Sequence, residues 1–462
     1  MSHTYQRLRG QRFCLGVTGL SRSGKSTFIT SLINQLLNHD TANLPGFAPV
    51  LTERLMGVKL HPPEDTDLKT FDYEESYRTI ANAEPQWPDS TDDISGCSLE
   101  LKLKLAQKSS KLNPFSNDHF SVFIDIRDYP GEWLLDLPLM DMSYSRWVAQ
   151  CSAQYSREPR KQLLGPLLEK LQQLDPLETV SPDQLKQLCD EFKQFLMACK
   201  DNTNSLSLIQ PGRFLIPGQI DDKELLMFIP LLRGASYTQG QLEKASKQSY
   251  YHLCKRRYEK YVKKLVKPFY KNFFKTIDRQ LILVDVVNAL NGGPEYIDDM
   301  RQALANISDS FSYGSQGAIM GLFRHKIDKV VFGATKVDQI LSEDHDAVRQ
   351  LLSLVVRQAY KSAQHEGVEP ICEAIAAVRS SSEVRQNGDQ ALTGADTAGN
   401  PIGYVHPTIP NRLPKGEEWQ PYLDWKIPAF NPPKGISAQN ADAIPHIRLD
   451  TVLNALIGDK CK

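Results

Sequence analysis

The sequence lacks the cysteine spacings that hold zinc or catalyse thiol exchange. Its eight cysteines include no C-x-x-C pair, so neither a zinc ribbon nor a disulfide framework is indicated. An excess of either charge is also missing, since 54 basic and 55 acidic side chains leave a net charge of −1. We therefore expect a reducing compartment and no nucleic-acid partner, which a strongly basic surface would attract.

Long apolar runs are absent as well. The nearest are LLMFIPLL (225–232) and LILVDVV (281–287), and a helix needs about 20 apolar residues to cross a bilayer. The first residues, MSHTYQRLRGQRF, contain no apolar stretch typical of a secretory signal. These absences predict a cytoplasmic protein, peripheral to the inner membrane where it meets a membrane at all.

What the chain does contain is a glycine-rich stretch between a strand pattern and a helix pattern. FCLGVT (13–18) is typical of a short buried strand, and TFITSLINQLL (27–37) has apolar residues at helical spacing. Between them, GLSRSGKST (19–27) matches G-x-x-x-x-G-K-[ST] in the context that this pattern needs. The alternative is a glycine-rich turn with a solvated lysine, which the complete pattern disfavours.

Each residue type in this stretch suits the binding of phosphate groups. Gly19 and Gly24 let backbone N–H groups point at one anion, and the following helix adds partial positive charge. Lys25 can reach the outer phosphates, and Ser26 can offer its hydroxyl to Mg²⁺. We therefore predict a nucleoside triphosphate site whose residues are Gly19, Ser21, Arg22, Ser23, Gly24, Lys25, Ser26 and Thr27.

Two later strand patterns end in residues that suit the same ligand. SVFIDIR (121–127) runs into DYPGEW, where Asp128 can hold Mg²⁺ through water and the N–H of Gly131 can meet the γ-phosphate. KVVFGA (329–334) runs into TKVD, where the Asp338 carboxylate can accept from the N1–H and amino group of guanine. Adenine offers no such pair of donors, so the sequence predicts GTP rather than ATP.

The order of these elements resembles that of the Ras-like GTPases. The resemblance implies an α/β, Ras-like P-loop fold with a mostly parallel sheet flanked by helices. It places Lys336 along the base and Thr335 where asparagine normally braces the P-loop, so bracing is expected to be weaker. The backbone of Ala377, Val378 and Arg379, at the end of the strand pattern EAIAAV (373–378), would meet the base.

A switch threonine that binds Mg²⁺ and senses the γ-phosphate is also implied. We nominate Thr91 in WPDSTDDIS for this role, with Thr66 and Thr79 as alternatives. Glu132 follows D-x-x-G, where Ras-like enzymes place the glutamine that orients water. A carboxylate can accept a proton from water but repels the charged transition state, so Glu132 is a catalytic candidate that predicts slow hydrolysis.

Several stretches together resemble one particular family. They are GLSRSGKST, WPDST, DYPGEW, LNGGP, ATKVD, AIAAVRS and PHIRLD, and they span nearly all of the chain. They resemble the bacterial YcjX-like proteins, stress-associated P-loop GTPases with a helical insertion. This implies a Mg²⁺-dependent GTPase that acts as a slow switch in bacterial stress response, with GTP and GDP as ligands and an unidentified protein partner beside membrane-stress systems.

The spacing of the elements predicts how the chain is divided. Residues 1–138 and 276–462 would form the GTPase domain, with a surface loop or hairpin at about 380–416, and residues 139–275 a helical insertion. Residues 255–275 form a basic amphipathic segment. One interpretation is that this segment contacts an anionic membrane or a partner. The favoured interpretation is that its apolar face packs into the core and its basic face lies in solvent.

Other functions stay open. A positive group for rapid hydrolysis could come from Arg22, Arg78 or Arg127 or from a partner. Glu132 and Thr335 favour, to some degree, a scaffold that is stabilised by nucleotide and does not hydrolyse it. The third reading is a P-loop ATPase or kinase, which T-K-x-D disfavours.

Overall fold

The structure is a computed structural model that describes residues 11–20, 22–89, 93–105, 118–202, 204–310, 327–365, 367–386 and 389–462. The chain divides into two compact units. The first consists of Met1–Pro130, Ile277–Gly293 and Gln316–Lys462, and the second of Gly131–Thr276 and Pro294–Ser315. The first stretch of the second unit thus begins eight residues before the predicted 139 and ends one residue after the predicted 275. This unit also contains helix α14 (Pro294–Asp309).

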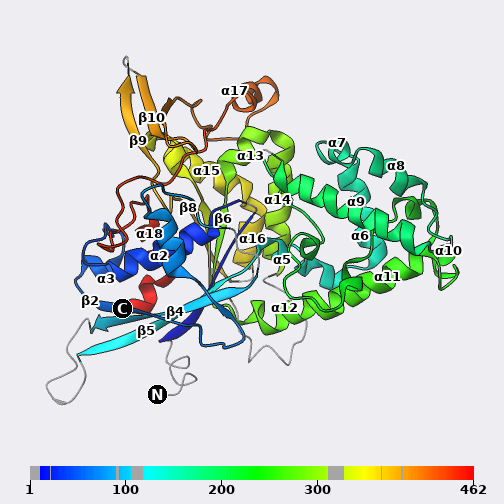
Figure 1. Ribbon diagram of the computed structural model, residues 1–462, viewed down its shortest axis with the longest axis horizontal. Helices are drawn as coiled ribbons and strands as arrows, with labels where there is room; N and C mark the ends of the chain where they lie inside the picture. The colour runs from blue at the N-terminus through cyan, green and yellow to red at the C-terminus, as the bar shows by residue number, and fades with distance from the viewer. Residues whose placement is uncertain are drawn as a thin grey trace. The chain divides into compact units, whose positions relative to one another are not determined.

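A mixed, mostly parallel sheet forms the centre of the first unit (Figure 1). Its strand order is β2-β4-β5-β1-β6-β7-β8, with β3 beside β4. Neighbours from β5 to β8 in this order are parallel, whereas β4 is antiparallel to both β5 and β2. The strands are β1 (Arg12–Gly19), β2 (Leu55–His61), β3 (Lys69–Thr70), β4 (Ser95–Lys104), β5 (His119–Asp128), β6 (Arg279–Val284), β7 (Lys329–Ala334) and β8 (Glu369–Ala374). This is the Ras-like α/β arrangement that the sequence predicted.

One strand lies earlier in the chain than predicted. The sequence placed it at 373–378, but β8 ends at Ala374 and the chain then leaves the sheet. Ile375, Ala376 and Val378 are nevertheless buried, with at most 3% of each exposed. The apolar run was typical of a strand because burial, and not sheet pairing, selects its residues.

The helices of the first unit pack their apolar faces on the large sheet. α2 (Lys25–Leu37) and α18 (Leu449–Ile457) share one core with β1, β4 and β5, and Phe28, Leu32 and Leu36 of α2 are buried there at helical spacing. α15 (His345–Val355) contacts β7 and β8, and α16 (Arg357–His365) contacts β8. The remaining α-helices of this unit in the described residues are α3 (Ala48–Leu51), α4 (Tyr73–Ile80), α13 (Val286–Gly292) and α17 (Gln420–Leu423).

A small antiparallel sheet follows β8 in the chain. It consists of β9 (Ser381–Gln386), β10 (Asp389–Ala395) and β11 (Pro401–Tyr404), in the order β11-β10-β9. β10 and β11 form a hairpin whose turn contains Asp396, which accepts hydrogen bonds from the N–H groups of Ala398 and Asn400.

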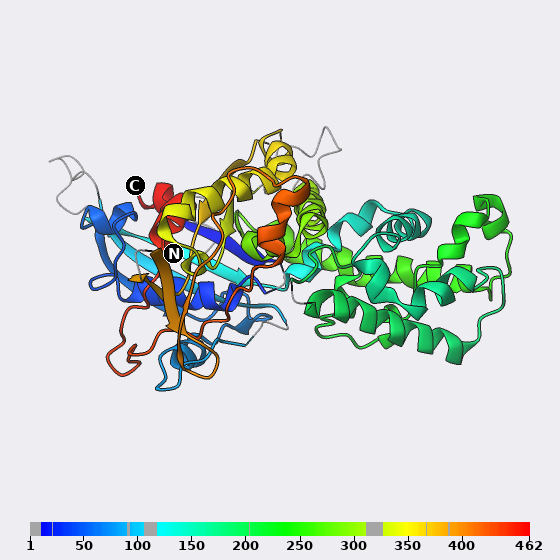
Figure 2. The ribbon, with the colours of Figure 1, turned by 90° about the horizontal axis from the view of Figure 1, so that it is seen from above.

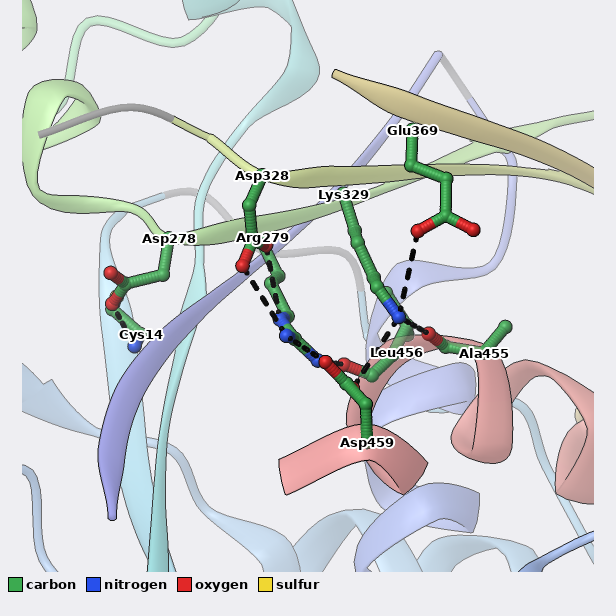
Figure 3. A network of polar contacts seen from close by, with 9 residues as sticks. All are labelled: Cys14, Asp278, Arg279, Asp328, Lys329, Glu369, Ala455, Leu456 and Asp459. Carbon is green, nitrogen blue, oxygen red and sulfur yellow. Dashed lines mark hydrogen bonds and ion pairs between the residues drawn. The ribbon is translucent and has the colours of Figure 1, made fainter. Parts of the chain in front are cut away.

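An ion-pair network fastens the end of the chain to the large sheet (Figure 3). The guanidinium of Arg279, at the start of β6, is 1% exposed and pairs with Asp459 at 2.6 Å and Asp328 at 3.1 Å. It also donates to the carbonyl of Leu456 in α18. Lys329 of β7 lies within 3.4 Å of Asp459, so one acidic side chain is held by two neighbouring strands.

The second unit consists of helices and loops over its described residues (Figure 2). Its core is aromatic, with Trp147, Tyr258 and Phe228 in mutual ring contact. The α-helices are α5 (Gly131–Leu134), α6 (Tyr144–Tyr155), α7 (Arg160–Leu164), α8 (Pro166–Gln173), α9 (Pro182–Asp201), α10 (Gln239–Glu243), α11 (Tyr250–Tyr261), α12 (Lys267–Asn272) and α14.

The basic segment 255–275 belongs to the core of this unit. It forms most of α11, a π-helical turn at Val262–Val266, and α12. Val262, Val266 and Phe269 are each at most 7% exposed, so the apolar face packs inside the unit, as the favoured interpretation required. No helix of the described residues is long and apolar enough to span a bilayer.

Candidate functional site

The loop between β1 and α2 has the backbone of a phosphate cradle. Gly24 has φ +79° and precedes α2 as its N-cap without a side-chain cap, so the first-turn N–H groups of α2 are not occupied by its own cap residue. Gly19 approaches its neighbours closely, because an added Cβ would lie 1.9 Å from Ser23 Oγ and 3.0 Å from the carbonyl oxygen of Leu283. Both glycines are therefore required by geometry.

A cavity of about 440 Å³ lies at this loop. Residues from five separate stretches of the chain line it. They are Arg22 to Phe28, Trp87 to Asp89, Thr335, Lys336, Asp338, Gln339, Ala376 to Val378, Ser380, Ala429 and Phe430. The structure thus brings the glycine-rich loop and the T-K-x-D residues to one cavity, although about 310 residues separate them in sequence.

Asp338 is held at the wall of this cavity by a neighbouring serine. Its side chain is 5% exposed, and Oδ2 accepts from both the N–H of Ser380, at 3.1 Å, and the Ser380 hydroxyl. Burial raises the pKa of Asp338 above its usual range, and the two bonds from Ser380 oppose that rise. The carboxylate also receives a bond from its own backbone N–H, and its remaining acceptor capacity is available to donors of a ligand.

The side chain of Lys336 has a hydrogen-bond partner, whereas the hydroxyl of Thr335 has none in the described residues. Lys336 has φ +61° and donates from Nζ to Asp285 Oδ2 at 2.7 Å. The hydroxyl of Thr335 is buried and finds no hydrogen-bond partner among the residues that the structure describes. Weaker bracing of the P-loop stays a prediction, and in the described residues the Thr335 hydroxyl makes no bond to that loop.

The backbone expected to meet the base is only partly available. Ala377 and Val378 line the cavity, and their N–H groups have no acceptor in the described part of the chain. Arg379 differs from the prediction. Its N–H donates to the carbonyl of Pro445 at 2.7 Å, its side chain bonds to the carbonyl of Ser381, and it lies outside the cavity lining.

Asp128 and Ser26 supply oxygen atoms of the kind that Mg²⁺ prefers. Ser26 lies in the first turn of α2 and lines the cavity. Asp128 is the last residue of β5 and is 1% exposed. Its Cα is the register partner of Val17, two residues before the glycine-rich loop begins. Of these two oxygen donors, Ser26 lines the cavity and Asp128 is not among its lining residues, so a cation site that uses both stays a prediction.

Several other candidates lie away from the cavity or outside the described residues. Ser21 and Thr91 are outside the described residues. Thr66 is an exposed loop residue, and the Thr79 hydroxyl donates to the carbonyl of Glu75 within α4. Of the three candidate arginines, only Arg22 lines the cavity; Arg78 pairs with Glu75, and Arg127 lies 3.8 Å from Asp65.

Gly131 and Glu132 belong to the second unit. Glu132 is 5% exposed and forms an ion pair of 3.1 Å with Lys200 of α9. The backbone carbonyl of Glu132 packs closely on Gly212, where an added Cβ would lie 2.0 Å from the carbonyl oxygen. The side chain is thus fixed within the helical unit, which sequence reasoning did not foresee, because no local pattern joins residues 132 and 200.

Sequence reasoning also assigned no role to Ser380 or to the aromatic wall formed by Trp87 and Phe430. The stretches WPDST and RSSS were visible in the sequence. Their contacts with the cavity depend on loops whose course a sequence pattern does not specify.

Comparison with known proteins agrees with this arrangement. The profile of the YcjX-like family, DUF463, matches residues 13–461. A protein of Escherichia coli (strain K12) named Ras-like GTPase YcjX is 36% identical over 455 residues, which cover 97% of this chain and 96% of that protein. A protein of the same name from Shewanella oneidensis is 34% identical over 460 residues, which cover 96% of this chain and 94% of that protein. The chain therefore belongs to the YcjX-like family.

Proposed function

We propose that this chain binds guanine nucleotide with Mg²⁺ and hydrolyses GTP to GDP and phosphate. The observation that carries the proposal is the single cavity shared by the first turn of α2 and the buried carboxylate of Asp338. One end suits phosphate groups and the other suits the donor edge of guanine. The name of the two relatives, Ras-like GTPase, supports the same reaction.

The residues take the following roles in this proposal. The backbone from Gly19 to Thr27 holds the phosphates, Lys25 neutralises their outer charge, and Ser26 and Asp128 hold Mg²⁺. Asp338 reads guanine, Lys336 and Thr335 border the base, and Ala377 and Val378 offer N–H groups. Thr91 would complete the metal site and Gly131 would meet the γ-phosphate. Bound Mg²⁺ would offset negative charge on the phosphates during their hydrolysis.

We further propose that hydrolysis is slow and that the chain is a switch in bacterial stress response. The buried ion pair of Glu132 with Lys200 supports slow turnover, because a carboxylate paired with a lysine has less capacity to accept from a water molecule and cannot donate to the charged transition state. The family resemblance is the support for the stress role. An unidentified protein partner, a cytoplasmic location and, at most, peripheral contact with the inner membrane belong to the same proposal.

The ion pair of Glu132 also supports a second candidate function. If Glu132 stays with Lys200 when nucleotide is bound, the chain would be a nucleotide-stabilised scaffold without turnover. Single-turnover hydrolysis of GTP with Mg²⁺ separates the two functions. The switch function predicts slow phosphate release that is lost in Lys25→Ala, and the scaffold function predicts none in either protein.

Base recognition is tested by exchanging the groups that face the base. Asp338→Asn replaces a pure acceptor by an amide that can also donate, and xanthine has a carbonyl where guanine has the amino group. We expect wild type to prefer GTP over both XTP and ATP, and Asp338→Asn to prefer XTP by at least about tenfold. Asp346→Asn, an exposed carboxylate on α15, is the matched control. Unchanged preference for GTP in Asp338→Asn would contradict the proposed base reading.

A further inference from the structure

Two aromatic residues from distant segments form a wall of the cavity that the proposed GTPase chemistry does not use. Trp87 belongs to the loop after α4, and Phe430 to the segment after α17; both line the cavity. Trp87 is 39% exposed, which is unusual for so large an apolar side chain. Its indole N–H donates to the carbonyl of Phe430 at 2.8 Å, so the ring is fixed although it is partly open to solvent.

The segment that holds this bond is itself fixed to the first unit. Phe430 is 3% exposed, and its ring packs on Gly394 of β10, where an added Cβ would lie 2.6 Å from a ring carbon. The N–H of Asn431 donates to the carbonyl of Ala395 at 2.9 Å. Upstream, Asn291 of α13 donates to the carbonyl of Tyr422 in α17 and to that of Trp425 in the segment after it. The carbonyl that anchors Trp87 is therefore a rigid acceptor.

The aromatic wall lies at the base end of the cavity. The Phe430 ring contacts the Tyr404 ring, with centroids 6.1 Å apart, and the Tyr404 hydroxyl donates to the carbonyl of Gln339 at 2.6 Å. Gln339 directly follows Asp338 and also lines the cavity. The wall and the base-reading carboxylate are thus supported by the same small sheet.

From these contacts we infer that Trp87 is a nucleotide-positioning residue, whose ring covers the base or ribose and whose bond to Phe430 slows release of the nucleotide. This inference rests on the proposed function. A base stacks on an aromatic ring whatever its edge groups are, so Trp87 adds affinity without choosing between guanine and xanthine. The choice of base stays with Asp338, and the two roles can be separated by experiment.

Two substitutions separate the contribution of the Trp87 ring from that of its hydrogen bond to Phe430. Trp87→Phe keeps an aromatic ring but loses the N–H donor, and Trp87→Leu loses both. We expect release of a fluorescent GDP analogue, measured by stopped flow, to be about tenfold faster in Trp87→Leu and about threefold faster in Trp87→Phe, because stacking contributes more than one neutral hydrogen bond. Trp419→Phe, a buried tryptophan outside the cavity lining, is the matched control.

Two further readouts exclude a merely structural effect. The ratio of GTP to XTP affinity is expected to stay unchanged in both Trp87 variants, and nucleotide is expected to change the tryptophan emission of wild type but less so that of Trp87→Phe. Release rates within twofold of wild type in both variants would overturn the inference while leaving the proposed function intact. A wild-type chain that binds no guanine nucleotide would instead overturn the proposed function and this inference with it.

Discussion

At the scale of single residues, the proposed specificity depends on one buried carboxylate and the serine beside it. Asp338 is removed from water, which raises its pKa, and a protonated carboxyl group would be a weaker acceptor for guanine. The hydroxyl and N–H of Ser380 stabilise the ionised form. Ser380 therefore acts on nucleotide through Asp338, even though it also lines the cavity.

Removal of this hydroxyl tests the dependence. We expect Ser380→Ala to weaken GDP binding about fivefold at pH 7.5, the effect of one lost hydrogen bond of about 1 kcal/mol. Because binding needs the ionised carboxylate, affinity should fall as the pH is lowered toward the raised pKa of Asp338, and the fall should begin at higher pH in Ser380→Ala. Isothermal titration between pH 5.5 and 8 measures both effects. Ser382→Ala, at an exposed position in the same serine run, is the control.

Asp338 and Ser380 show how much of the candidate site could be predicted from the sequence. Asp338 could be predicted because T-K-x-D is contiguous and follows a strand pattern. Its partner Ser380 lies 42 residues later, beyond a helix pair and another strand, so the contact exists only in the folded chain. Local patterns therefore indicated a side chain that lines the cavity and missed the serine that bonds to it.

At the scale of elements, the predictions were most accurate where periodicity was strong. β7 has the predicted bounds, and α2 begins within two residues of its predicted start. β8 was misplaced because a buried loop continues its apolar run. The apolar run LILVDVV is divided between the end of β6 and the start of α13, and Asp285 between them caps α13 by accepting from the N–H of Asn288.

One contact between elements predicts a pH effect on stability. His345, the first residue of α15, bonds through Nε2 to the carbonyls of Val337 and Ile340, which lie on either side of Asp338 and Gln339. Burial lowers the pKa of His345 below 6.5, and the two carbonyls oppose the shift. The unfolded chain then binds more protons, so the stability linked to this group is complete above pH 6.5 and is lost as the pH falls through the lowered pKa.

His345→Gln isolates this contribution, because glutamine keeps an amide donor and does not titrate. We expect the free energy of unfolding of wild type to fall between pH 7.5 and 5.5, and the fall to be smaller in His345→Gln. Urea denaturation at the two pH values measures the difference. Equal pH dependence in the two proteins would show that the buried imidazole is not the titrating group.

At the scale of the whole molecule, the last α-helix of the described residues, α18, packs into the core of the first unit. α18 shares the core of β1 and α2, although more than 400 residues lie between β1 and α18. Such a contact is costly in loop-closure entropy and depends on specific anchors. The network around Arg279 provides one, since it joins β6 and β7 to α18 and to the turn that follows α18 (Figure 3).

Replacement of the buried guanidinium should therefore loosen the closure of this unit. Arg279→Met keeps most of the apolar stem but leaves the buried carbonyl of Leu456 without its donor and removes one cation from two partly exposed carboxylates. Asp459 keeps its contact with Lys329, so we expect a loss of about 2 kcal/mol in the free energy of unfolding. Arg301→Met, which removes a surface pair on α14, should change stability by less than about 0.5 kcal/mol.

The pH dependence of this network distinguishes the ion pair from simple packing. Burial opposes the charge of Asp459, but the bonds and charge of Arg279 outweigh it and hold the pKa of Asp459 well below its usual value of 3.8. The stability from this pair is then present above pH 3.8 and is lost as the pH falls below that value. If the guanidinium acts through charge, Arg279→Met should remove most of this acid-sensitive part, and only the share due to Lys329 should remain. Asp459→Asn in the Arg279→Met background should then cost little more. If the two losses simply add, and the acid sensitivity persists, the network stabilises the unit by packing alone and the end of the chain is held by the apolar face of α18.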